Sequence, residues 1–182
     1  MRNYAASTPL SLLTERGHHA GMLNASRLRR ALARAGVAVM LAAPAAAATA
    51  QAVPQPRLPV VALQAGIHVI HAEVAATPAT RAAGLMMRER LGPNEGMLFV
   101  FQDKAQQCFW MRNTLVPLSI AFLDDDGRIV SIADMAPRSD DSHCSARPVR
   151  FALEMEQGWF ARRALAGGAQ LLNPKVFPGQ VR

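Results

Sequence analysis

The sequence lacks most of the motifs that identify common functions. It has no glycine-rich phosphate-binding loop, no dinucleotide-binding fingerprint and no zinc-ligand signature. His68 and His71 are three residues apart, so on a strand their side chains would point to opposite faces. No internal repeat is present after residue 51. These absences argue against a nucleotide-dependent enzyme or a zinc protein built on those motifs.

A concentrated basic region is also missing from most of the chain. The 182 residues include 20 Lys and Arg and 13 acids, which gives a formal net charge of +7. Six of the basic residues but only one of the acids lie in residues 1–50, so residues 51–182 have a net charge of only +2. Nucleic-acid binding needs a concentrated basic surface. The charge distribution therefore predicts no nucleic-acid partner.

The chain has one apolar run near its start, and this run is short. Residues 27–34 read RLRRALAR and are followed by the small apolar residues AGVAVMLAAPAAAATA, which Pro44 interrupts. Spanning a bilayer takes roughly 20 apolar residues, so we interpret 1–50 as a signal peptide cleaved after Ala50, and not as a transmembrane anchor. We therefore expect a periplasmic or secreted protein with no stable membrane span after cleavage.

Only two cysteines occur, Cys108 and Cys144, and both follow the expected cleavage site. In an oxidising compartment a lone pair of cysteines usually bonds, so we predict a disulfide, with a reactive thiol or a metal-ligand pair as alternatives. The segment DDSHCSARP places Asp140 and His143 beside Cys144. A Cys/His enzyme is thus kept as an alternative, although neighbours in sequence rarely converge on one reacting atom.

The hydrophobic pattern predicts a mainly β fold with two short helices. Residues 51–66 contain three prolines and are interpreted as a flexible linker or an extended edge, and residues 67–182 as a single domain. The expected strands are 67–75, 96–101, 118–124, 128–134 and 148–155, and the expected helices are 78–91 and 158–168. This order is typical of a small β-sandwich or barrel, jelly-roll-like, with a parallel α/β sheet as the alternative.

Two arginines on the first expected helix, Arg81 and Arg88, are seven residues apart and so lie on nearly the same face. They could form a solvated stripe. The alternative hypothesis is that at least one guanidinium packs against the sheet and pairs with Glu73, Glu154 or an acid of the turn at 124–126.

The stretch CFWMRNTLVPLSI, residues 108–120, places polar side chains in an apolar region. As a strand it would put Trp110 and Arg112 on one face and Asn113 on the other. One interpretation is that Arg112 stacks on Trp110 at the surface. The other is a cleft wall, in which the indole, the guanidinium and the amide would suit a sugar or carboxylate ligand. The candidate ligand-binding residues are Trp110, Arg112, Asn113, Thr114, Arg88, Arg81 and Glu154.

We assign no catalytic residue, metal ligand or cofactor, but soft-metal binding remains an alternative function. Thioethers select copper(I), and methionines recur through the expected domain. They are Met86, Met87, Met97, Met111, Met135 and Met155. Methionine also fills irregular cores, and most of these residues sit among Leu, Phe and Val.

Three stretches together resemble the family called domain of unknown function 192. They are TPATRAAGLMMRERLGPNEGMLFVF, FWMRNTLVPLSIAFLDDDGRIVSI and ALEMEQGWFARRAL, and the resemblance covers roughly residues 67–173. The matching residues are Arg81, Gly84, Leu85, Met86, Arg88, Gly96, Met97, Phe109, Trp110, Met111, Asn113, Thr114, Pro117, Leu118 and Gly127. The resemblance implies a small exported or membrane-anchored β domain, implies no activity, and transfers no catalytic residue. The function expected from the sequence is binding of a small ligand or an unknown protein partner.

Overall fold

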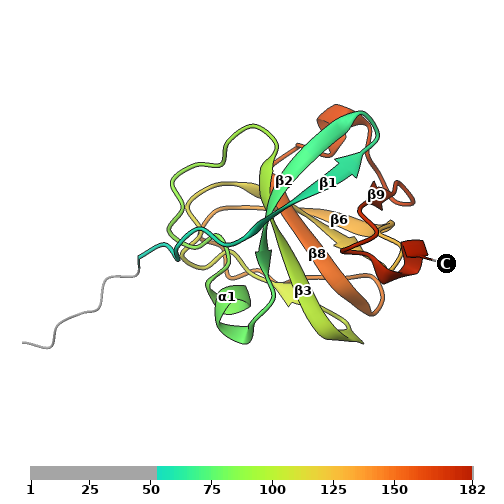
Figure 1. The fold of residues 1–182 in the computed structure, drawn as a ribbon. Coiled ribbons are helices and arrows are strands. Elements are labelled where there is room, and N and C mark those ends of the chain that lie inside the picture. The colour runs from blue at the N-terminus through green and yellow to red at the C-terminus, as the bar shows by residue number, and fades with distance from the viewer. Residues whose placement is uncertain (1–52, 182) are drawn as a thin grey trace, which may run out of the picture. The chain divides into compact units, whose positions relative to one another are not determined.

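Seven strands form one curled sheet in the computed structural model, which describes residues 53–181 (Figure 1). Their order across the sheet is β6-β5-β8-β3-β2-β1-β9, and β4 pairs with β7 in a separate ribbon. The strands are β1 Val60–Ala65, β2 His68–Ala75, β3 Glu95–Ala105, β4 Cys108–Phe109, β5 Leu118–Leu123, β6 Ile129–Met135, β7 His143–Cys144, β8 Val149–Glu156 and β9 Leu171–Leu172. The curled sheet makes a half-barrel with few helices, which confirms the expected mainly β, single-domain fold.

The curl brings the two edges of the sheet together at one end. The Ile129 N–H donates to the Ala169 carbonyl at 2.8 Å, and the Leu171 N–H donates to the Gly127 carbonyl at 2.9 Å. Since β9 also pairs with β1, these bonds connect the first and last strands of the sheet order. Gly127 has a φ of +73°, and a Cβ there would collide with the Leu171 carbonyl. This close approach therefore requires glycine.

Both faces of the sheet are covered by apolar side chains. Leu98 on β3 joins an inner cluster to which all seven strands contribute, so this cluster fills the curl. Its neighbours Met97 and Phe99 point to an outer cluster, which also contains Leu85 and Met111 from loops. Burial on both faces explains why every residue of β5 is buried, because a strand covered on both sides needs no polar face.

Helix α1, Pro78–Ala83, is shorter than the expected helix at 78–91. The start was predicted correctly: Thr77 caps the first turn with its hydroxyl, and proline follows it. The predicted end was wrong because Gly84 takes a φ of +48°, outside the helical region, and terminates the helix. A Cβ on Gly84 would lie 3.4 Å from the Phe99 ring, so this turn packs closely on the sheet.

The second expected helix, 158–168, is also wrong. Only the three residues Ala161–Arg163 are helical, as a 3-10 turn, and Ala164 ends it with a φ of +53°. A further 3-10 turn at Pro178–Val181 was not predicted. No helix within residues 53–181 is long and apolar enough to cross a bilayer.

The expected linker at 51–66 is partly wrong, because residues 60–65 form β1. This strand lies between β2 and β9, and it buries Leu63 and Ala65 in the inner cluster. The three prolines all precede the strand, where they remove no hydrogen bond from the sheet. The expected signal peptide at 1–50 lies outside the described residues.

The predicted disulfide joins Cys108 to Cys144 and is confirmed. The two cysteines face each other in the β4–β7 ribbon, so the bond fastens its two strands together. The bond links positions 36 residues apart.

Removing this bond should destabilise the fold. The double variant Cys108→Ser/Cys144→Ser is expected to lose about 3–4 kcal/mol of unfolding free energy, because the unfolded chain regains the freedom of that loop. Urea unfolding of the wild type with and without dithiothreitol measures the same loss. The reductant should leave the double variant unchanged, and equal stability of all four samples would contradict the prediction.

A candidate ligand-binding cavity

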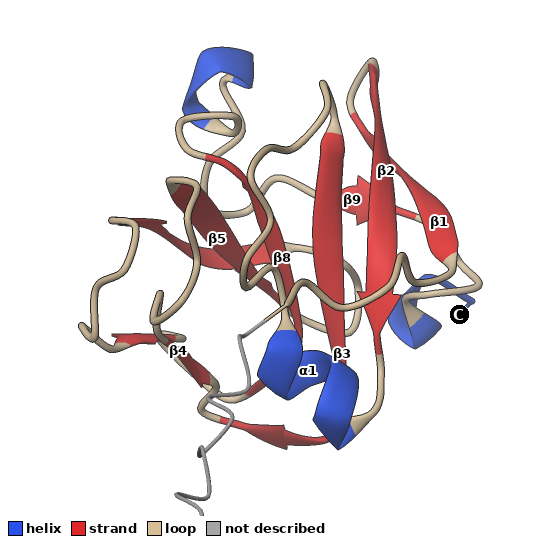
Figure 2. Cartoon of the chain, turned by 90° about the vertical axis from the view of Figure 1, so that its left-hand side faces the viewer, coloured by secondary structure: helices blue, strands red, loops and turns tan. Residues whose placement is uncertain are grey.

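A cavity of about 310 Å³ lies between α1 and the ribbon that β4 forms, over the outer face of β3 and β8. In Figure 2, α1 and β4 both lie toward the lower end of the view. Strand β3 contributes aromatic rings, the loop after β4 contributes Thr114, and β8 contributes Glu154. Segments far apart in the sequence therefore meet around one space.

One wall of the cavity is aromatic. Phe109 meets Phe99 edge-to-face, with ring centroids 4.9 Å apart, and Phe101 with centroids 6.3 Å apart. Trp110 extends this wall toward solvent and is 52% exposed. Such pairs fix ring orientation beyond what burial alone achieves. The wall is thus a preformed apolar surface.

The Arg81 side chain is fixed at the rim of the cavity. One terminal nitrogen donates to the carbonyls of Ala76 at 2.6 Å and Val100 at 2.9 Å, and the guanidinium carbon lies 4.8 Å from the centre of the Phe101 ring. None of the ion pairs in residues 53–181 includes Arg81. Its charge is therefore positioned by backbone and aromatic contacts and not by an acid.

Glu154 lies at the base of the cavity and is only 4% exposed. Its cross-strand neighbours are apolar, Met97 on β3 and Ile120 on β5. No hydrogen bond among residues 53–181 uses its carboxyl group. Burial disfavours the charged form and raises the pKa of Glu154 to about 8. At neutral pH this side chain is mostly a neutral carboxylic acid, which both donates and accepts hydrogen bonds.

Four of the seven candidate ligand-binding residues line the cavity, namely Trp110, Thr114, Arg81 and Glu154. Cys108 lines it as well. The expected alternation along residues 108–114 is wrong beyond Phe109, where β4 ends and the chain turns. Asn113 takes a φ of +61°, and its carbonyl accepts the Met87 N–H at 2.9 Å, so it shapes this turn outside the cavity.

Arg112 also lies outside the cavity. Its Nε donates to Asp140 at 2.8 Å, and its guanidinium stacks 4.6 Å from the centre of the Trp110 ring. The side chain is 53% exposed. This is the surface stack that the sequence offered as one interpretation. The acid could not be identified beforehand because it lies 28 residues further along the chain.

Because the Arg112 side chain is exposed, removing it should change the stability of the protein only slightly. Arg112→Ala should melt close to the wild type, because exposed ion pairs stabilise little. Arg81→Ala should cost about 1–3 kcal/mol, because its charged hydrogen bonds to two carbonyls are lost. Thermal unfolding of both variants tests the contrast. A larger loss for Arg112→Ala than for Arg81→Ala would contradict it.

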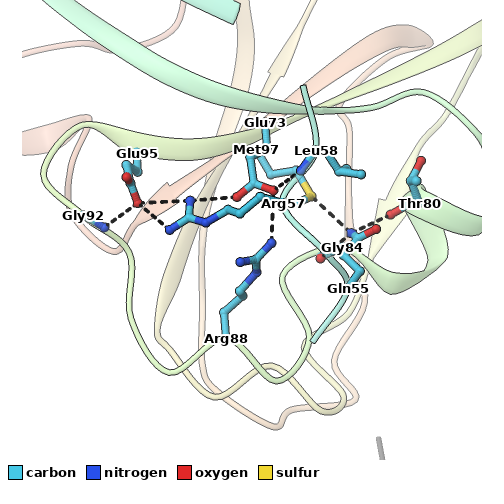
Figure 3. Close-up of polar contacts among 10 residues, drawn as sticks. All are labelled: Gln55, Arg57, Leu58, Glu73, Thr80, Gly84, Arg88, Gly92, Glu95 and Met97. Atoms are coloured by element: carbon cyan, nitrogen blue, oxygen red, sulfur yellow. Dashed lines mark hydrogen bonds and ion pairs between the residues drawn. The ribbon is translucent and has the colours of Figure 1, made fainter. Parts of the chain in front are cut away.

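The N-terminal residues 53–59, which we call the strap, pack beside the cavity (Figure 3). The Gln55 amide donates to the carbonyls of Thr80 at 3.1 Å and Gly84 at 2.7 Å, which lie at the end of α1. The Thr80 carbonyl also accepts the Gly84 N–H at 3.0 Å, whereas the Gly84 carbonyl lies past the last helical residue, where helices leave carbonyls without intrahelical partners. The strap therefore holds one wall of the cavity in place.

Glu73 is the second buried carboxylate, and unlike Glu154 it is fully paired. It is 2% exposed and binds Arg57 at 2.9 Å, Arg88 at 3.0 Å and the Leu58 N–H at 2.8 Å. Figure 3 shows both guanidinium groups pointing toward it. The predicted pairing of one arginine with Glu73 is thus confirmed for Arg88, which stabilises the strap and does not line the cavity. The shared helix face was wrong, because α1 ends at Ala83 and Arg88 lies beyond it.

Four of the six methionines that suggested copper binding pack in the core, and the other two, Met86 and Met87, are half-buried. Met97, Met111 and Met135 are fully buried in the outer apolar cluster, and Met155 in the inner one. Within residues 53–181 no three His, Cys, Asp or Glu side chains are grouped so as to hold a metal ion. Cys144 has no thiol while the disulfide is intact, so a thiol nucleophile in the segment 140–144 is contradicted.

Comparison with known proteins places the chain in a family. The family model for domain of unknown function 192, described as "Uncharacterized ACR", matches residues 60–172, so the chain belongs to that family. A solved structure of a "putative transcription regulator" from Sinorhizobium meliloti 1021 is 33% identical, with a TM-score of 0.58, over 61% of this chain and 89% of that one. A protein of unknown function from Novosphingobium aromaticivorans DSM 12444 is 36% identical, with a TM-score of 0.63, over 69% of this chain and 94% of that one. No curated protein matches.

Proposed function

We propose that this chain is an exported binding domain whose small ligand enters the cavity between α1 and the β4–β7 ribbon. The observation that carries the proposal is Glu154, a buried carboxyl group at the cavity floor that no other described residue bonds. Its oxygens are not among the fully enclosed, unpaired polar atoms, so they face the cavity. A ligand that bonds Glu154 there would take the place of water.

The chemistry of the lining supports binding more than catalysis. Apolar walls with a few placed polar groups are typical of ligand sites, and here the polar groups include the Arg81 guanidinium, the Thr114 hydroxyl and the Glu154 carboxyl. A volume of about 310 Å³ is at the lower end of the usual range, so it suits a compact ligand such as a small sugar or carboxylate. Export is supported by the N-terminal sequence pattern and by the disulfide, which is rare in reducing compartments.

A thermal-shift screen tests the proposal. The purified protein is heated with sugars, carboxylates, amino acids and soft metal ions, and a specific ligand should raise the melting temperature by mass action. The variant Ala83→Phe, which fills the cavity from α1, should abolish that rise. Ala161→Phe, an identical change at an exposed position outside the cavity, should preserve it. A rise that survives Ala83→Phe would locate the ligand elsewhere, and no rise with any class would contradict the proposal.

A further inference from the structure

Two ionisable side chains line the cavity, and they differ in charge. Helix α1 contributes Arg81, and β8 contributes Glu154. The lining residues of β3 are aromatic, Gln107 and Thr114 are neutral, and Cys108 cannot ionise because it is in the disulfide. From β5, the neighbour of Glu154 is Ile120. No other titratable group of residues 53–181 lines this cavity.

The electrostatic balance of the cavity is positive. Arg81 remains charged at any working pH and has no acidic partner among the described residues. Glu154 contributes no compensating charge near neutral pH, because burial holds its pKa at about 8. A cation without a counter-ion, in the lining of the same cavity as an acid that keeps its proton, attracts an anion.

Glu154 also offers the geometry of a hydrogen-bond donor. Its protonated form presents one O–H group to the cavity, and an O–H bond to a ligand oxyanion is among the stronger hydrogen bonds in proteins. The aromatic wall formed by Phe99, Phe101 and Phe109 would hold an apolar body. The small volume limits that body to about one ring or a short chain.

We propose, building on the ligand-binding function above, that the ligand is a compact monocarboxylate with an aromatic or short aliphatic body. Its carboxylate accepts the hydrogen bond of Glu154 within the field of Arg81, and its body lies on the aromatic wall. A cationic ligand would be repelled by Arg81 and would have to displace the Glu154 proton. A neutral sugar could accept hydrogen bonds from Arg81 but would gain no attraction between opposite charges.

Three probes that share one ring separate these ligand classes: benzoate, benzyl alcohol and benzylammonium. Titration calorimetry at pH 7 should show benzoate binding at least tenfold more tightly than benzyl alcohol, with benzylammonium weakest. Raising the pH should weaken benzoate binding tenfold per unit above about 8, or about thirtyfold between pH 7 and pH 9.5, because ionised Glu154 repels the ligand.

Two matched variants locate this pH dependence. Glu154→Gln keeps a hydrogen-bond donor that does not titrate, so benzoate affinity should stay constant between pH 7 and pH 9.5. Glu156→Gln changes an exposed acid on the same strand and should retain the wild-type pH dependence. Arg81→Gln should lower benzoate affinity at least tenfold more than it lowers benzyl alcohol affinity.

Different results would overturn the carboxylate proposal and the broader ligand-binding function. If benzylammonium or benzyl alcohol binds most tightly, or if wild-type benzoate affinity is flat with pH, the carboxylate proposal is overturned. If that binding is nevertheless lost in Ala83→Phe, the cavity still binds ligands and the broader function stands. Benzoate binding that survives Ala83→Phe, or no binding of any probe, overturns the carboxylate site.

Discussion

Glu73→Ala should lower the free energy of unfolding by about 3–5 kcal/mol, because it leaves buried positive charge without a partner. Glu73 is 2% exposed and is shared by Arg57 and Arg88. The Arg88 side chain is only 13% exposed, so water cannot fully solvate it after the carboxylate is removed. The Leu58 N–H would lose its acceptor as well.

Urea unfolding at neutral pH measures this loss. Glu156→Ala is the matched control, because Glu156 also pairs with an arginine, Arg162, but its side chain is 66% exposed. That variant should unfold close to the wild type. Equal losses for the two variants would mean that burial of the Glu73 pair contributes nothing to stability.

Glu154→Gln should raise the free energy of unfolding relative to the wild type at alkaline pH. It should also make that free energy less dependent on pH. The folded chain holds the Glu154 proton up to a pKa of about 8, whereas the ordinary value is 4.5. The stabilising contribution of this proton is fully present below about pH 4.5 and is lost as the pH rises to about 8, at about 1.4 kcal/mol per unit. The accumulated loss in the wild type is on the order of 5 kcal/mol.

The amide cannot ionise, so it avoids this loss. Urea unfolding of the two proteins at pH 5 and pH 8.5 should show the variant gaining stability relative to the wild type as the pH rises. The gain should be several kcal/mol, because burial of the carboxyl group raises its pKa from 4.5 to about 8. Parallel pH profiles would show that Glu154 is solvated or paired in solution.

Local sequence patterns predicted most of the strands, but they did not predict the element boundaries that tertiary packing determines. The hairpin turn at 125–127 and the cap at Thr77 depend on neighbouring residues, and both were predicted correctly. The helix beyond Gly84 was wrong because its end is set by packing on Phe99, a strand residue that local propensity does not include. Strand β1 was left open between a linker and an extended edge, because three prolines precede it.

The site was predicted in part for the same reason. Trp110 and Thr114 were found because polar and aromatic groups in an apolar stretch signal a boundary between core and surface. The sequence left Arg112 open between a surface stack and a cleft wall, because its partner, Asp140, is brought near only by the β4–β7 pairing. Glu154 appeared in the sequence as one side of an alternating strand. Only the fold shows that both sides of that strand are covered.

Closure of the sheet through β9 also determines when the chain can fold. Phe177, near the end of the described chain, packs against Phe151 inside the curl, with ring centroids 5.2 Å apart. Strand β1, the first to be synthesised, pairs with β9, the last. Such distant pairings place the domain among proteins of high contact order, which fold in milliseconds to seconds and not in microseconds. The interior of the domain therefore cannot be completed before β9 and Phe177 are available to pack.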